Sequence, residues 1–167
     1  MKAIVYSSHT GFTEKYAKLL GEKTGLPVFD LKQAKKELEA GAPVMYLGWL
    51  MAGGIKGLKK AQKSFEVKGV CAVGMAPAET QKLEEMKTRN GWSGEGFFVL
   101  QGGYAPEKEH GMYKMMLNMV TSSTIKKLSA KENLTDEDRA TIEGMQRGYD
   151  AVSAEALEPV AAWMSGK

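Results

Sequence analysis

The sequence lacks the features on which several common protein classes depend. It contains one cysteine, Cys71, which excludes an internal disulfide and a metal centre built from several cysteines. No basic-then-apolar leader opens the chain, and no window approaches the ~20 apolar residues of a membrane-spanning helix. A net charge of +3 is too small to indicate a nucleic-acid binder. We therefore expect a cytoplasmic protein that binds no nucleic acid.

The motifs of hydrolases and metalloenzymes are also missing. The two histidines, His9 and His110, do not stand at the spacing of zinc ligands, and no Ser-His-Asp order or usable pair of carboxylates is found. No Gly-Lys-Ser/Thr follows a glycine turn, which excludes a P-loop. We therefore assign no catalytic residue and no metal ligand. The length and the ordinary composition, 43% hydrophobic and 26% charged, predict a single domain over residues 1–167.

The chain does show a regular alternation of apolar runs and helical patterns up to about residue 101. The near-continuous apolar character of most runs is typical of parallel strands buried on both faces. Repeated strand–helix units predict an α/β fold with a doubly wound sheet. The expected strands span residues 2–7, 27–30, 43–48, 67–74 and 96–101. The expected helices span residues 13–24, 32–39, 54–63 and 78–88.

One short segment between the first strand and the first helix carries the strongest chemical signal. It reads Ser8-His9-Thr10-Gly11-Phe12-Thr13. The first amides of a helix have no partner within the helix, and the helix dipole places partial positive charge there. Three hydroxyl groups add donors, and Gly11 allows close approach of the backbone. The segment, which contains no Lys or Arg, predicts a site for a phosphate held by neutral donors; a capped helix that binds nothing is the alternative.

The pattern Ser-x-Thr-Gly-x-Thr directly after a first strand resembles the phosphate loop of flavodoxins, which binds the phosphate of FMN. The resemblance covers residue 2 to about residue 101 and the last helix. It implies a flavodoxin-like five-stranded parallel sheet in the order 2-1-3-4-5, with a ligand at the carboxyl ends near strands one and three. It also implies FMN as cofactor, with the residues of the segment around its phosphate: Ser8, His9, Thr10, Gly11, Phe12 and Thr13.

Two further loops are implied as contacts of the flavin ring. In flavodoxins the loop after strand three covers one ring face, and a flexible peptide there bonds the flavin N5. Here that loop contains Trp49, Leu50, Met51, Ala52 and Gly53, of which Trp49 and Met51 are the candidate ring contacts. Gly53-Gly54 is the candidate flexible peptide, because glycine accepts either sign of φ. A half-buried core tryptophan and a plain turn before a helix are the alternatives.

The loop after strand four, Gly74-Met75-Ala76, is short and lacks the aromatic residue that flavodoxins often place there. Gly103 and Tyr104, after strand five, form a candidate cover for the ring instead. The alternative for Tyr104 is a surface position in the following insertion.

A helical insertion is expected at about residues 104–149, with helices from about 108 to 128 and from 135 toward 145, before a closing helix over 153–164. Its methionines fall on one helical stripe, and they are Met112, Met115, Met116 and Met119, followed by Val120. The stripe is either a core-facing surface or an adaptable surface for a partner, a quinone or a membrane face. The insertion gives a weaker resemblance to menaquinone-dependent protoporphyrinogen oxidase, a flavodoxin-fold FMN enzyme.

These observations predict an FMN-binding, flavodoxin-like protein that transfers electrons to a redox partner protein or a quinone. Two alternatives stay open. One is a quinone- or porphyrinogen-linked FMN oxidoreductase. The other is a non-redox module that binds a different phosphate ligand.

Overall fold

The computed structural model describes residues 1–78 and 82–166. The chain divides into two compact units, which we call the sheet unit (Met1–Gly102 with Ala151–Lys167) and the helical unit (Gly103–Asp150). That the whole chain behaves as one domain with an insertion at about 104–149 stays a prediction. Within the described residues, no helix combines the length and the apolarity that crossing a bilayer requires.

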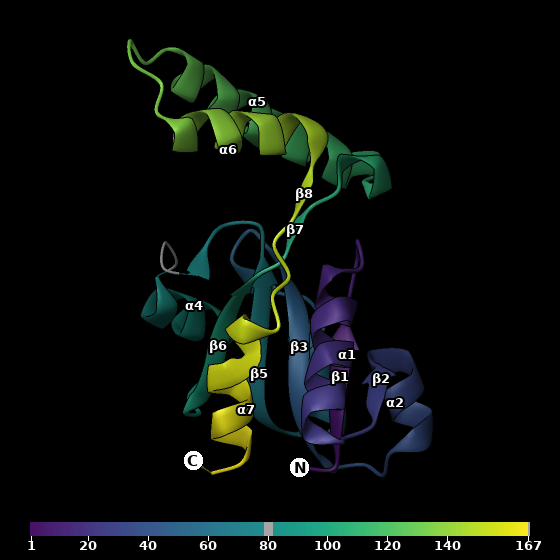
Figure 1. The fold of residues 1–167 in the computed structure, drawn as a ribbon. Helices are drawn as coiled ribbons and strands as arrows, with labels where there is room; N and C mark the ends of the chain where they lie inside the picture. The colour runs from purple at the N-terminus through teal and green to yellow at the C-terminus, as the bar shows by residue number, and fades with distance from the viewer. Residues whose placement is uncertain (79–81, 167) are drawn as a thin grey trace. The chain divides into compact units, whose positions relative to one another are not determined.

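The sheet unit contains a mainly parallel sheet, as the sequence predicts (Figure 1). Its main path runs β2-β1-β3-β5-β6, and a further strand, β4, pairs antiparallel with β3. Among the described residues this makes six strands, one more than the five that the sequence predicts, and the additional strand is β4. Their bounds are β1 (Ala3–Ser7), β2 (Val28–Asp30), β3 (Pro43–Met51), β4 (Gly54–Ile55), β5 (Glu66–Gly74) and β6 (Gly96–Gln101).

Helices cover both faces of this sheet, and each face has its own buried cluster (Figure 1). On one face α1 (Phe12–Thr24) and α7 (Glu158–Met164) pack their apolar sides, with Tyr16 and Leu20 fully buried. The other face carries α2 (Leu31–Glu37), α3 (Leu58–Ser64) and α4 (Leu83–Asn90). The three layers explain why the central strands read as continuous apolar runs rather than alternating ones.

Several expected helix bounds are corrected. Residues 54–57 do not begin a helix: they form β4 and the turn to α3, whose N-cap Gly57 has φ 82°. The closing helix expected over 153–164 is shorter. A 3-10 turn, η3 (Glu155–Leu157), comes first, and α7 begins at Glu158, with Pro159 in its first turn. Of the helix expected over 78–88, residues 79–81 lie outside the described residues.

The helical unit is an antiparallel pair of helices joined to a short two-stranded sheet (Figure 1). Strands β7 (Gly103–Tyr104) and β8 (Tyr149–Asp150) pair, and η2 (Pro106–Lys108) leads into the helices. The two helices are α5 (Gly111–Ser129) and α6 (Asp136–Arg147). A capping box starts α6, in which Thr135 and Asp138 each bond the other's backbone N–H.

Three of the four methionines on the α5 stripe face solvent, and the fourth, Met116, is half-buried. Met112 is 80% exposed, and Met115 and Met119 are each 69% exposed. The interpretation of the stripe as a core-facing surface is therefore wrong for these residues.

Candidate functional site

The predicted phosphate segment folds as a tight loop between β1 and α1. Ser8 to Gly11 form the loop, and Phe12 and Thr13 are the first residues of α1. Gly11 is the N-cap, with φ 101°, a conformation that a residue with a Cβ rarely adopts. As a glycine it supplies no side-chain acceptor to the first-turn amides of α1. This is the arrangement that favours an anion at a helix N-terminus.

The hydroxyl groups of the loop differ in accessibility. Ser8 is half-buried, and its Oγ accepts a hydrogen bond of 3.1 Å from the Gly11 amide, which fixes the shape of the loop. Thr10 is also half-buried, whereas Thr13 is 1% exposed. Glu14, in the same first turn, pairs with Lys18 at 2.6 Å, which offsets its negative charge near the loop.

The segment expected as a loop after strand three is mostly strand. Trp49, Leu50 and Met51 extend β3, and they turn back through Ala52 and Gly53 into β4. Both turn residues have positive φ, 48° and 76°, as a two-residue hairpin turn of the I′ type requires. This local geometry, rather than a helix start, accounts for the glycine pair.

The carboxyl end of α4 clamps this hairpin. Asn90 is 8% exposed, and its Oδ1 accepts a hydrogen bond from the Ile55 amide at 2.7 Å while its Nδ2 donates to the Gly53 carbonyl at 2.9 Å. Arg89 donates to the Ala52 carbonyl at 2.7 Å. The turn carbonyls are therefore held by side chains. A change of the Gly53 peptide, which the flavodoxin resemblance implies, has to break these bonds.

Trp49 links the hairpin to the phosphate loop. Its ring stacks on His9, with ring centroids 4.9 Å apart and an interplanar angle of 19°. Lys56 Nζ lies 6.0 Å from the centroid of the same ring, within cation–π range. The loops after β1 and β3 thus meet at the carboxyl edge of neighbouring strands, where doubly wound sheets bind their ligands. His9 has a packing role here, which its place in a polar loop did not indicate.

The ends of β5 and β6 close the same edge of the sheet. A Cβ added to Gly74 would lie 2.9 Å from Leu50 Cδ1, so the hairpin packs directly over the end of β5. Gln101 Nε2 donates to the Met75 carbonyl at 3.1 Å, which ties the loop after β5 to β6. A Cβ added to Gly102 would lie 3.0 Å from Phe12 Cβ, so β6 ends beside the start of α1. Ala76 is exposed.

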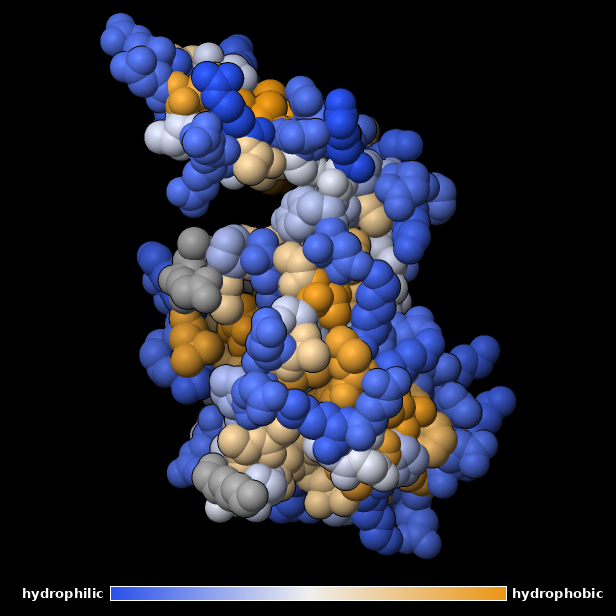
Figure 2. All heavy atoms as spheres, viewed as in Figure 1, coloured by the Kyte–Doolittle hydropathy of each residue, from blue (hydrophilic) through white to orange (hydrophobic). Residues whose placement is uncertain are grey.

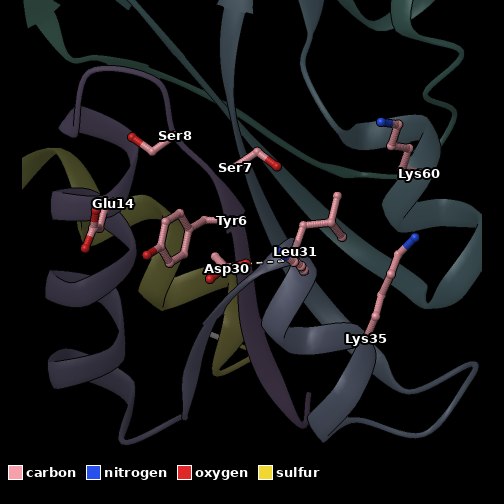
Figure 3. A pocket seen from close by; sticks show the side chains of 9 residues that line it. Tyr6, Ser7, Ser8, Glu14, Asp30, Leu31, Lys35 and Lys60 are labelled. Carbon is pink, nitrogen blue, oxygen red and sulfur yellow. Dashed lines mark hydrogen bonds between the residues drawn. The ribbon is translucent and has the colours of Figure 1, made fainter. Parts of the chain in front are cut away.

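An open cavity of about 590 Å³ adjoins the phosphate loop (Figure 3). Ser7 lies in its middle, with Lys35 and Lys60 on one side and Ser8, Tyr6 and Glu14 on the other. Its other lining residues are Asp30, Leu31 and Lys32. Asp30 caps α2 by accepting from the amides of Lys32 and Gln33. Burial, with Glu14 and Asp30 nearby, raises the pKa of the Tyr6 hydroxyl group.

Lysines therefore stand close to a loop that contains none. Lys60 comes from α3 and Lys35 from α2, elements that meet the loop only in the folded chain (Figure 3). The six residues of the segment contain no lysine, but the cavity beside them does, and the binding of a phosphate by neutral donors stays a prediction. The sequence contains one sign of these lysines, because several of them follow the glycines near the start of α3.

Close backbone packing fixes the floor of this region. A Cβ added to Gly57 would lie 2.1 Å from Tyr46 Oη and 2.6 Å from Ser7 Oγ, so only glycine fits. Tyr46 donates to the Lys56 carbonyl at 2.7 Å. Burial raises the pKa of Tyr46 to about 12, which keeps its hydroxyl group protonated as a donor.

Gly103 and Tyr104 form β7 of the helical unit, where Tyr104 is 4% exposed. The alternative of a surface tyrosine is therefore wrong, and a role of Tyr104 in covering a flavin ring stays a prediction.

No protein-family model matches this chain, and no curated protein matches it. Two solved structures are similar to it. One is a "putative flavoprotein" from Bacteroides uniformis ATCC 8492, with a TM-score of 0.41 and 13% identity over 70% of this chain and 96% of that chain. The other is the rubredoxin:oxygen oxidoreductase of Desulfovibrio gigas, with a TM-score of 0.36 and 16% identity over 99% of this chain and 37% of that chain. With values this low, neither likeness carries an argument about function.

The sheet fits a flavodoxin-like fold. From β1, the chain adds β2 on one side and then β3, β5 and β6 on the other, so the strand order reverses between β1 and β3. The candidate site lies at the carboxyl ends of these two strands, where such folds bind their ligands.

Proposed function

We propose that this chain binds one FMN at the carboxyl edge of β1 and β3 and serves in electron transfer. The observation that carries the proposal is the meeting of two unlike surfaces at one edge. The uncapped N-terminus of α1 offers amides to a phosphate, and Trp49, stacked on the same loop through His9, offers an aromatic face.

The residues present fit the phosphate end of FMN. The amides of Phe12 and Thr13 would bind the phosphate oxygens, and the Ser8 and Thr10 hydroxyl groups would supply further donors. Gly11 would let the backbone approach, because a Cβ would stand between the amides and the ligand. Lys35 and Lys60 line the adjoining cavity and would raise the local potential for a dianion.

The residues also fit the ring end, with one condition. Trp49 already stacks on His9, so a ring placed against that face of the indole has to displace His9. Leu50 and Met75 would provide apolar contacts at the ends of β3 and β5. FMN, when bound, would supply the one- or two-electron chemistry, and the chain would position it and exclude water. The partner would be a redox protein or a quinone.

One specific observation favours a second candidate, a non-redox module for another phosphate ligand. The lining of the cavity beside the loop is mostly polar, with three lysines and two serines and Tyr6 as its one aromatic residue, and it suits a small phosphorylated metabolite. A quinone- or porphyrinogen-linked oxidoreductase is a narrower form of the first proposal. It differs by catalysing turnover of the small substrate.

The decisive experiment is a titration of the flavin-free protein with FMN and with riboflavin, which lacks the phosphate. We expect a yellow complex and an affinity for FMN at least tenfold above that for riboflavin. Binding should also quench tryptophan fluorescence, because Trp49 contacts the ring. Equal affinities would contradict a phosphate-directed site, and a colourless protein that FMN does not stabilise would favour the non-redox module.

A matched pair of glycine variants separates the loop from general stability. Gly11→Ala and Gly25→Ala both place a Cβ at a positive φ, 101° and 71°, at the two ends of α1. Each should cost about 1–2 kcal/mol of folding free energy. Only Gly11→Ala should also weaken FMN binding. A loss of FMN affinity in Gly25→Ala of the same size would contradict the assignment of the loop.

A further inference from the structure

The outer face of α5 combines two properties that a solvated helix does not need. Met112, Met115 and Met119 follow one another along this face, with exposed fractions of 80%, 69% and 69%. Lys126 continues the same line two turns further on, and Lys127 lies beside it, both exposed. We call these five residues the methionine–lysine face.

This face points away from the contact of α5 with its own unit. Most of the buried and half-buried residues of α5 lie on another side of the helix, and the full set is Tyr113, Met116, Leu117, Thr121, Thr124, Ile125 and Leu128. Thr121 is the fully buried one, and α6 is the helix that α5 contacts. Met112, Met115 and Met119 therefore do not serve the packing of the helical pair, whereas Met116 is half-buried. The side of this unit drawn in Figure 2 is mostly hydrophilic.

The charge of α5 has one sign. The helix has 19 residues, of which three are lysines, and none is aspartate or glutamate. Exposed apolar side chains next to unpaired lysines match a surface that is apolar below and anionic above. Lysine reaches such a boundary well, since its aliphatic stem lies along apolar atoms while its ammonium group stays among the head groups.

We infer that the methionine–lysine face of α5 binds the surface of a bilayer that contains anionic phospholipids. The unbranched methionine side chains enter the boundary between head groups and acyl chains, and Lys126 and Lys127 bind the lipid phosphates. This contact is peripheral and reversible, because one short apolar face gives only modest membrane affinity. It does not depend on the proposed FMN site.

Other occupants fit the face less well. A second copy in a two-fold contact would bring the face against itself, and α5 has no acidic residue to pair with the lysines. A stable protein interface buries about 800 Å² on each partner and centres on Trp, Tyr or Arg, none of which lies on this face. Lysine, which this face carries, is depleted in such interfaces.

The test is co-sedimentation of the full-length protein with vesicles. One set is phosphatidylcholine alone, and the other contains phosphatidylcholine and phosphatidylglycerol in equal parts. We expect binding to the anionic vesicles at low ionic strength, little binding to the neutral ones, and strong weakening at about 1 M salt, where the Debye length falls to about 3 Å. Equal binding to both vesicle types would overturn the inference.

Variants of the face are compared with matched variants elsewhere. Lys126→Gln with Lys127→Gln should lower the partition into anionic vesicles by about 30-fold. Lys36→Gln with Lys63→Gln, exposed lysines on α2 and α3, changes the net charge equally and should have little effect. The triple variant Met112→Ser, Met115→Ser and Met119→Ser should lower the partition into anionic vesicles by about 100-fold or more. Leu83→Ser, at a 39% exposed apolar residue of α4, is its control.

Folding does not limit the test, because the substituted side chains are exposed and circular dichroism should not change. Sedimentation of the protein without lipid measures whether the face binds a second copy of the chain instead of a bilayer. A monomer whose size is the same in the wild type and the triple serine variant supports the inference. A dimer that the serine variant loses would overturn it in favour of a second copy, as would unchanged vesicle binding in that variant.

Discussion

The two units of this protein are stabilised in different ways. In the sheet unit, two clusters of fully buried side chains lie on either side of the strands, with Ile4, Val5, Tyr16 and Tyr46 at 0% exposure. In the helical unit the two long helices bury little: Thr121 is the buried residue of α5 and Asp138 that of α6. The sheet unit is thus stabilised mainly by burial, whereas the two long helices of the helical unit depend more on caps, hydrogen bonds and an ion pair.

The difference indicates which surfaces of each unit tolerate substitutions without loss of folding. A surface that contributes little to folding is free to present methionine and lysine to a partner. A sheet edge whose residues are fixed by packing on both faces is suited to positioning a ligand. The following changes test this comparison, from the largest expected effect to the smallest.

Leu20→Ala should have the largest effect, because Leu20 is fully buried between α1 and the sheet. We expect a loss of about 2–5 kcal/mol in the free energy of unfolding. Leu128→Ala, at a half-buried residue of α5, should cost less than half as much. Urea unfolding followed by tryptophan fluorescence measures the loss in Leu20→Ala, since Trp49, Trp92 and Trp163 all lie in the sheet unit. Similar losses in both variants would contradict the comparison.

Asn90→Ala should come next, because it leaves the buried Ile55 amide without its acceptor and frees the Gly53 carbonyl. We expect a loss of about 2 kcal/mol and faster hydrogen exchange at Ile55. Arg89→Ala is the control. It removes one exposed bond to the same turn and should cost under about 1 kcal/mol. If the Ile55 amide hydrogen exchanged no faster in Asn90→Ala than in the wild type, the Asn90 hydrogen bonds would not stabilise the hairpin.

Thr135→Ala should cost about 1 kcal/mol, confined to the helical unit, because it removes the N-cap of α6. Far-UV circular dichroism should show an earlier loss of helix, while the tryptophan transition of the sheet unit stays in place. A parallel shift of both signals would mean that the two units unfold together.

Acidification should have the smallest effect, again in the helical unit. A hydrogen bond from Lys131 Nζ, 2.6 Å from Asp138 Oδ1, holds the pKa of Asp138 below its usual value of 3.8, helped by the Thr135 amide. A lowered folded pKa gives stability that is present above about 3.8 and lost as the pH falls through the folded value. Asp138→Asn should flatten this acid dependence in the helix signal. An unchanged profile would show that another carboxylate controls it.

Part of the candidate site could be predicted from the sequence. The order of strand, Gly11-containing turn and helix was readable because a helix start depends on neighbouring residues only. The contact of His9 with Trp49 was not readable, because the two residues lie on separate loops and meet only when β1 and β3 pair. The sequence does not predict the hairpin at Ala52 and Gly53, because Gly53-Gly54 fits a flexible peptide or a plain turn before a helix equally well.

The sequence by itself determined the alternation of strands and helices and the glycine-containing turn before α1, since hydrophobic periodicity and turn chemistry act within a few residues. Tertiary structure alone decided that Lys35 and Lys60 reach the cavity beside that turn, that α4 clamps the hairpin, and that the methionines of α5 face solvent. These outcomes depend on which distant surfaces meet. A methionine stripe has the same periodicity whether it is buried or exposed, so only the packing of its neighbours distinguishes the two.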